Sequence, residues 1–216
     1  MGKPAEIRIR EGRWDELVDR ARSLAANGHR RILGIAGAPA AGKSTVAAAI
    51  VAALAPVAIL VPMDGFHLAE AELHRLGRHP RKGAVDTFDA DGFAALLRRL
   101  RAAPPGVVYA PEFRREIEEP IAGAIPVPAD VPLVVTEGNY LLTDIGPWAE
   151  VRELLDEVWF LELDEGVRLE RLTARHMAYG RDSAEAAGRA RGTDQRNADL
   201  IAATRDRADL VVRLIA

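Results

Sequence analysis

The stretch Gly37-Ala38-Pro39-Ala40-Ala41-Gly42-Lys43-Ser44-Thr45 decides how the rest of this sequence is interpreted. It follows an apolar run over residues 31–36, which predicts a buried strand, and precedes an alanine-rich run over 46–54, which predicts a helix. Glycines let the backbone curl so that successive N–H groups point at an anion, and the following helix adds its positive N-terminal end. A strand, a glycine-rich loop, Gly-Lys-Ser and a helix in this order predict a phosphate-binding loop.

Every residue of this loop except Pro39 is expected to take part in nucleotide binding. Lys43 is placed to reach the β- and γ-phosphates, and the Ser44 hydroxyl is a ligand for Mg²⁺. The alternative is a glycine-rich turn between strand and helix with an incidental lysine. The residues expected to bind the nucleotide are Gly37, Ala38, Ala40, Ala41, Gly42, Lys43, Ser44 and Thr45.

The composition of the chain narrows its class. Its 216 residues suit one α/β domain, and a hydrophobic content of 49% can supply a sizeable core. A net charge of −3 gives no reason to expect nucleic-acid binding, and the absence of cysteine excludes disulfides, thiolate metal sites and a catalytic thiol. The charged N-terminus lacks the apolar core of a signal peptide, and no run of about 18 apolar residues predicts a membrane span. We therefore expect a soluble cytoplasmic protein without membrane partners.

Predicted strands alternate with predicted helices along the chain, which is typical of a mostly parallel sheet in a three-layer α/β/α P-loop NTPase fold. Strands are expected over 31–36, 57–62, 133–136, 157–163 and 209–214. Helices are expected over 11–27, 46–54, 68–73, 91–102, 147–155, 165–179, 183–190 and 194–204. Extended pieces around the charged run 112–119 predict a hairpin-like excursion from the main sheet.

Two carboxylates come directly after predicted strands. Asp64 follows the strand over 57–62, at the edge where ligands sit in open parallel sheets, and could accept or orient the proton of an attacking hydroxyl. The alternative is a turn-forming Asp-Gly. Glu137 ends the strand over 133–136, and because a buried, unpartnered carboxylate is costly, we expect it to help hold Mg²⁺ rather than to be an acid at a helix N-terminus.

Three arginines share one face of the helix predicted after the fourth strand. Arg168, Arg171 and Arg175 are spaced i, i+3 and i+7, so their guanidiniums can close over a triphosphate as a lid and stabilise charge during transfer. The alternative is a solvated face paired with Glu165 and Glu170.

The histidines give weaker signals. His67 lies three residues after Asp64 and could contact a substrate or be a polar surface residue. The spacing of His67, His74 and His79 is irregular and no cysteine accompanies them, so no zinc site is expected.

Four blocks together resemble the uridine kinase, phosphoribulokinase and bacterial pantothenate kinase group of phosphate-loop small-molecule kinases. The similarity spans about Ile32 to Val212 and is closest to bacterial proteins described as nucleoside/nucleotide kinases or as fructose or sugar kinases linked to transport. The blocks are 37–45, Met63-Asp64-Gly65-Phe66-His67-Leu68, Arg81-Lys82-Gly83 with Asp86-Thr87-Phe88-Asp89, and Thr136-Glu137-Gly138-Asn139-Tyr140.

The resemblance implies ATP and Mg²⁺ as cofactors, with Lys43, Asp64, Arg171 and Arg175 as catalytic residues and Ser44 and Glu137 at the metal. The residues that it implies near the acceptor are His67, Arg81, Lys82, Tyr109, Phe113, Arg114, Arg115, Glu137 and Tyr140. Uridine kinases have a Tyr-Asp-Phe pattern followed by His and Arg, whereas Tyr109-Ala110-Pro111-Glu112-Phe113 lacks that Asp and that His.

The sequence therefore predicts one kinase domain over 1–216, with an acceptor region at about 64–120 and a lid at about 165–192. The expected reaction transfers the γ-phosphoryl group of Mg·ATP to a hydroxyl of a small polar metabolite, such as a sugar, a sugar-like compound or a nucleoside. Pantothenate or uridine kinase activity is an alternative, and a regulatory ATPase without an acceptor is an alternative of another class. Basic residues at 78–82 suggest an acidic or phosphorylated acceptor but could equally touch ATP. A homodimer is possible.

Overall fold

A parallel β-sheet forms the middle layer of the computed structural model, which describes residues 2–26, 28–178, 182, 186, 188 and 192–215. Six described strands follow the order β1-β8-β7-β2-β6-β3, and every neighbouring pair is parallel. A separate antiparallel hairpin pairs β4 with β5. The strands are β1 (Ala5–Arg10), β2 (Arg31–Gly37), β3 (Ala58–Leu60), β4 (Val107–Arg114), β5 (Glu119–Pro128), β6 (Leu133–Gly138), β7 (Glu157–Glu162) and β8 (Leu210–Ile215).

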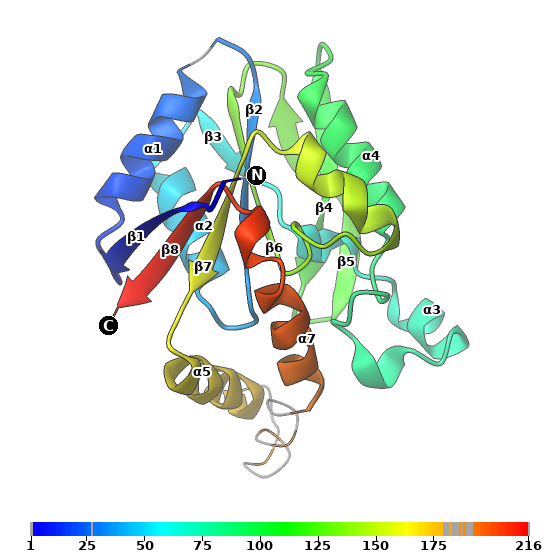
Figure 1. The fold of residues 1–216 in the computed structure, drawn as a ribbon. Coiled ribbons are helices and arrows are strands. Elements are labelled where there is room, and N and C mark those ends of the chain that lie inside the picture. The colour runs from blue at the N-terminus through cyan, green and yellow to red at the C-terminus, as the bar shows by residue number, and fades with distance from the viewer. Residues whose placement is uncertain are drawn as a thin grey trace.

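Helices cover both faces of this sheet, which confirms the predicted three-layer α/β/α fold (Figure 1). The α-helices are α1 (Asp15–Ala25), α2 (Lys43–Leu54), α3 (Glu70–Arg75), α4 (Ala90–Arg101), α5 (Glu165–Ala178) and α7 (Thr193–Ala202). The 3₁₀ helices are η1 (Met63–Phe66), η2 (His79–Arg81), η3 (Gly146–Leu154) and η4 (Arg205–Arg207). None of the described helices is long and apolar enough to cross a membrane.

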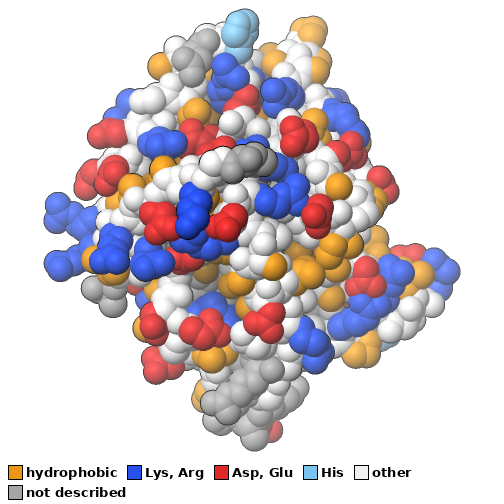
Figure 2. All heavy atoms as spheres, viewed as in Figure 1, with side chains coloured by type: hydrophobic (Ala, Val, Ile, Leu, Met, Phe, Trp, Pro, Cys, Tyr) orange, Lys and Arg blue, Asp and Glu red, His pale blue; other side chains and the backbone are white. Residues whose placement is uncertain are grey.

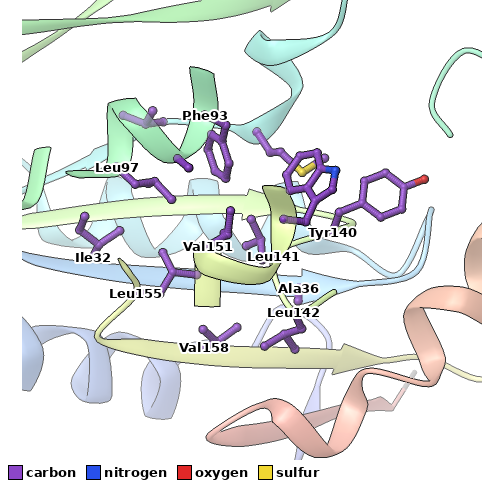
Figure 3. Packing of buried hydrophobic residues seen from close by; sticks show 14 of the residues in the cluster. Ile32, Ala36, Phe93, Leu97, Tyr140, Leu141, Leu142, Val151, Leu155 and Val158 are labelled. Atoms are coloured by element: carbon purple, nitrogen blue, oxygen red, sulfur yellow. The ribbon is translucent and has the colours of Figure 1, made fainter. Parts of the chain in front are cut away.

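Alternate residues of the central strands supply two hydrophobic clusters, one on each face. Ile32 of β2 packs with Phe93 of α4 and Val151 of η3, as Figure 3 shows. The next residue, Leu33, packs on the opposite face with Ile50 of α2. Because a parallel sheet is covered on both faces, its central strands are apolar throughout, and that continuous pattern made them predictable.

Most predicted elements are present, with boundary shifts of a few residues. Asp89 caps α4 as expected, since its side chain accepts a 2.8 Å hydrogen bond from the Gly92 N–H. The helix predicted over 147–155 is the 3₁₀ helix η3, and the strand predicted over 57–62 pairs only over β3. The helix predicted over 183–190 lies outside the described residues, apart from 186 and 188.

Strand β1 is an element that the sequence analysis missed. Its residues alternate between apolar and charged side chains, and only Ile9 is buried. It forms the edge of the sheet by pairing with β8, the last strand of the chain. Such a short alternation is a weak signal, because half of an edge strand is in contact with water.

Candidate active site

The phosphate loop connects β2 to α2 with an unusual backbone. Gly42 has φ +93° and stands immediately before Lys43, the first residue of α2. Ala40 also has a positive φ, +66°, a conformation that costs an L-residue about 1–2 kcal/mol. These left-handed residues turn the loop toward the helix N-terminus, where N–H groups can face an anion.

Lys43 is buried beneath the phosphate loop. Its Nζ donates hydrogen bonds to the carbonyl oxygens of Gly37 and Ala38, at 2.9 and 3.0 Å, and to Asn139 Oδ1 at 2.7 Å. Burial lowers the pKa of Lys43 to about 8, against the opposing effect of the nearby Glu137 and Asp64 carboxylates. The ammonium is therefore held beneath the loop by groups that all accept hydrogen bonds.

Ser44, in the first turn of α2, contacts Glu137, near the end of β6. The Ser44 hydroxyl donates to Glu137 Oε1 at 2.8 Å, and the Glu137 residue is only 7% exposed. Burial and the neighbouring charge of Asp64 raise the pKa of Glu137, whereas Lys43 lowers it. A hydroxyl and a carboxylate in direct contact are hard oxygen ligands, so these two residues fit a Mg²⁺ ion.

Asp64 lies on η1, next to the β4–β5 hairpin. Its side chain is 30% exposed, and Arg115 Nη2 lies 3.4 Å from Asp64 Oδ2. Gly65 allows this contact, since a Cβ there would lie 2.4 Å from the carbonyl oxygen of Pro111. The tight contact brings the hairpin beside the Asp64 carboxylate.

His67 is held between two aromatic rings. Its ring centroid lies 4.0 Å from that of Phe88 and 4.7 Å from that of Phe113. Its Nδ1 lies 2.9 Å from the Asp64 carbonyl oxygen, so Nδ1 carries the proton and Nε2 is left as an acceptor. Burial lowers the pKa of His67, which favours this neutral form.

The two predicted basic residues of the 78–83 loop have different places. Lys82 lies beside the hairpin, where its Nζ is 2.6 Å from both Glu70 Oε1 and the Glu118 carbonyl oxygen. The same ammonium lies 5.1 Å from the centre of the Phe113 ring. Arg81 instead pairs with Asp86, so it is not brought to the Asp64 side chain.

A β-bulge between Ala110 and Glu112 separates two residues that were expected to act together. The extra residue resets the alternation of β4, so Phe113 contacts His67 while Tyr109 is 56% exposed. Tyr109 is therefore not brought into contact with these groups, contrary to expectation. Arg114 lies 3.5 Å from a carboxylate oxygen of Glu112, which is on the same strand.

Tyr140, which was expected near the acceptor, is buried and supports the loop at Gly83. Its ring belongs to the hydrophobic cluster in Figure 3, with the hydroxyl at the edge. That hydroxyl donates a 2.6 Å hydrogen bond to the Gly83 carbonyl oxygen, which also accepts from Asn197 Nδ2 at 3.4 Å. Burial raises the pKa of Tyr140, so it stays a neutral donor. Tyr140 therefore affects the site indirectly, through its hydrogen bond to the loop at Gly83.

The arginines of α5 diverge. Arg168 is 2% exposed, and its Nη1 lies 3.4 Å from the Pro39 carbonyl oxygen of the phosphate loop. Arg171 makes a bidentate pair with Glu11, with both contacts at 2.6 Å, so it does not point to the phosphate loop. Arg175 is close enough for its charge to lower the pKa of Lys43.

Two hollows flank this group of residues. One, of about 650 Å³, lies between the phosphate loop, the carboxyl ends of β7 and β8, α5 and α7. The other, of about 700 Å³, is lined by residues 112–116 of the hairpin. Asp64 pairs with Arg115 from this second hollow, while its charge reaches the buried Lys43.

Asn139 is a residue of the site that the sequence analysis did not single out, and Arg168 was given only a shared role in the lid. Asn139 belongs to the block that follows β6, and its position one residue past the strand end was the available signal. Arg168 was recognised as part of a basic face, but the sequence could not show that it is buried against the loop. Phe88 was likewise quoted in a block without a role.

The site combines a phosphate loop and its buried Lys43 with the Asp64 carboxylate, which borders a second hollow. This arrangement is that of a phosphate-loop kinase acting on a small molecule. Residues 32–216 match the Phosphoribulokinase / Uridine kinase family. The chain belongs to this family and is a small-molecule kinase that uses ATP.

Similarity to individual proteins supports this family assignment. The chain is 34% identical over 176 residues to the Schizosaccharomyces pombe protein named "Putative uridine kinase C227.14", covering 77% of this chain and 75% of that protein. It is 37% identical over 153 residues to the Aspergillus versicolor "ATP-dependent kinase-like protein notR'", covering 66% of this chain and 88% of that protein. The crystal structure of a "putative fructose transport system kinase" from Silicibacter sp. TM1040 superposes with a TM-score of 0.81 at 35% identity, covering 90% of this chain and 98% of that one.

Proposed function

We propose that this kinase transfers the γ-phosphoryl group of Mg·ATP to a hydroxyl of a small polar acceptor, with sugars and sugar-like compounds as the first candidates. The observation that carries the proposal is the place of Asp64. Its carboxylate pairs with Arg115 at the hairpin hollow, and its charge also acts on Lys43 and Glu137. A base at that position can serve an acceptor on one side and a triphosphate on the other.

The proposed mechanism assigns a task to each group. Asp64 accepts the proton of the acceptor hydroxyl as that oxygen attacks the γ-phosphorus atom in line with the leaving ADP oxygen. Lys43 and Arg175 stabilise the charge on the transferred group. Ser44 and Glu137 would hold Mg²⁺, which supplies further charge stabilisation when bound. Arg171 can take part in phosphoryl transfer only if its ion pair with Glu11 breaks.

The surroundings of Asp64 support an acceptor rich in hydroxyl groups. The Nε2 of His67 is left as a hydrogen-bond acceptor, Arg115 supplies donors, and Phe113 supplies an apolar face. The name of the Silicibacter relative, "putative fructose transport system kinase", points to the same class. The other hollow, between α5, α7 and the phosphate loop, is proposed to take the nucleoside of ATP.

Turnover with a panel of acceptors tests this function. ADP release from Mg·ATP is measured for the full chain with sugars, polyols, nucleosides, glycerate and pantothenate, and without any of them. We expect a hexose or polyol to raise turnover above the bare ATPase rate. A stronger response to pantothenate or uridine would favour those specific alternatives. If no acceptor raises the rate while ATP binds, a regulatory ATPase becomes the better interpretation.

A further inference from the structure

Three metal-ligating side chains meet outside the active site, on the projection formed by α3 and the loop after it. Glu70 is the first residue of α3, His74 lies one turn later, and His79 begins η2. One donor atom from each lies within 4.8 Å of the others. His79 Nε2 is 3.0 Å and His74 Nε2 is 4.0 Å from the same oxygen, Glu70 Oε2. This juxtaposition overturns the expectation that the histidine spacing offers no metal constellation.

The chain reversal after α3 explains why irregular spacing gives a compact cluster. The helix ends at Arg75, Gly77 turns with φ +66°, and the Arg78 N–H bonds back to the Leu73 carbonyl oxygen at 2.8 Å. The turn lays the ring of His79 on that of His74, with centroids 4.0 Å apart and planes within 16° of parallel. A turn of this kind is invisible in the residue spacing alone.

We propose that Glu70, His74 and His79 bind one transition-metal ion of the Zn²⁺ class. Two imidazoles and a carboxylate are a ligand set that suits zinc, with a fourth position for water. Bond lengths of about 2.0–2.2 Å in a tetrahedral site place ligand atoms about 3.3–3.6 Å apart. The separations of 3.0 and 4.0 Å to Glu70 Oε2 lie on either side of that range. One of the stacked imidazole rings must also rotate out of the stack so that both nitrogen lone pairs point at one ion. The histidine side chains are 64% and 39% exposed, which leaves a path for the ion.

Lys82 is the group that both organises and opposes this site. Its Nζ lies 2.6 Å from Glu70 Oε1, which fixes the carboxylate with Oε2 toward the histidines. The same positive charge repels a cation. The Figure 2 view shows basic and acidic side chains close together on this projection. Lys82→Met should therefore strengthen metal binding.

The metal site would be coupled to the acceptor region through the same lysine. An ion on Glu70 Oε2 repels the Lys82 ammonium and weakens the attraction between Lys82 and Glu70 Oε1. Lys82 also contacts the Phe113 ring and the hairpin backbone at Glu118. Occupancy should change the KM for the acceptor and leave the KM for ATP unchanged. This consequence rests on the proposed function, whereas metal binding itself does not.

Calorimetric titration of the full chain with ZnCl₂, in excess Mg²⁺, tests the site. We expect one saturable site per chain, weakened at least about tenfold in His74→Gln and in His79→Gln because each loses one of three protein ligands. His29→Gln is the matched control, since His29 is an exposed histidine in another loop. The visible spectrum of the Co²⁺ complex should show intense tetrahedral bands in the wild type and the control only.

Some results would overturn the proposal. One is the absence of saturable Zn²⁺ binding. Another is stoichiometric binding that persists in the His74→Gln/His79→Gln double variant with intact circular dichroism. A third is loss of the site in Glu137→Gln, which would place the ion at the phosphate loop. If Zn²⁺ binds as expected but no acceptor is phosphorylated, the metal site stands and the proposed kinase substrate class fails.

Discussion

The hydroxyl of Ser44 donates a 2.8 Å hydrogen bond to Oε1 of Glu137, which joins the first turn of α2 to the end of β6. The parallel register of β2 and β6 produces this contact, because Ile35 pairs with Glu137 two residues before the phosphate loop begins. A buried carboxylate is thereby placed at the loop that binds a polyanion. Such a charge is unfavourable in the free protein and useful only when cations accompany the nucleotide.

Glu137→Gln should separate stability from function. Because burial raises the pKa of Glu137, the folded wild type loses stability as pH rises from the ordinary glutamate pKa through the raised value. The neutral variant should gain stability over wild type at pH 8 and show little difference near pH 4, measured by urea unfolding. Its kcat with Mg·ATP should fall by at least about 10². A variant less stable than wild type at pH 8 would show that the Lys43–Glu137 attraction outweighs desolvation.

Lys43 should take up a proton when the nucleotide binds. Its pKa of about 8 leaves about half of the free protein deprotonated at that pH, and a triphosphate beside it favours the charged form. Binding of a non-hydrolysable ATP analogue at pH 8 should therefore absorb about half a proton, measured by calorimetry in buffers of different ionisation enthalpy. Lys43→Arg is the control, since guanidinium stays charged. Equal uptake in both proteins would assign the proton to another group.

Asp64→Asn tests the proposed base. The amide keeps the shape of the side chain but cannot accept the hydroxyl proton, so kcat should fall by at least about 10² with the KM for ATP nearly unchanged. Steady-state kinetics with the best acceptor of the panel measure both. Loss of ATP affinity with kcat retained at saturation would instead indicate a structural or metal-binding role for Asp64.

The centre of the fold and of the site could be predicted from the sequence because local patterns determine them. Continuous apolar runs define β2 and β6, and the glycine-rich loop between β2 and α2 fixes where Lys43 and Ser44 stand. Once those strands are parallel neighbours, Glu137 must lie beside Ser44. Asp64 follows from the same argument, as it comes after β3, the strand beyond β6.

The periphery of the site could not be predicted, because long-range partners decide it. A single bulge in β4 puts Phe113 and Tyr109 on opposite faces, although Pro111 was a sign that regular pairing would fail there. The partner of Arg171, Glu11, follows a strand whose pattern was too short to recognise. Arg168 and Arg171, three residues apart on α5, were expected to act together, yet they contact the phosphate loop and Glu11 respectively.

Tyr140→Phe should loosen the loop at Gly83 without harming the core. The variant loses one hydrogen bond from a buried hydroxyl, so the free energy of unfolding should fall by about 1 kcal/mol. Tyr109→Phe removes the same atom from an exposed side chain and should change stability by less than about 0.5 kcal/mol. Urea unfolding compares the two. Equal losses would mean that the Tyr140–Gly83 bond contributes nothing specific.

Arg168 and Arg171 should have different effects when each is replaced by alanine. Arg168 is buried against the phosphate loop, so Arg168→Ala should raise the KM for ATP by at least about tenfold. Arg171 is bonded to Glu11, and Arg171→Ala should mainly lower stability, by up to about 1 kcal/mol. Glu11→Gln separates the possibilities, because it removes the ion pair and leaves the guanidinium. If Arg171 only anchors α5 to the end of β1, both variants should lose similar stability and keep kcat. If Arg171 also reaches the triphosphate during turnover, kcat should fall in Arg171→Ala alone.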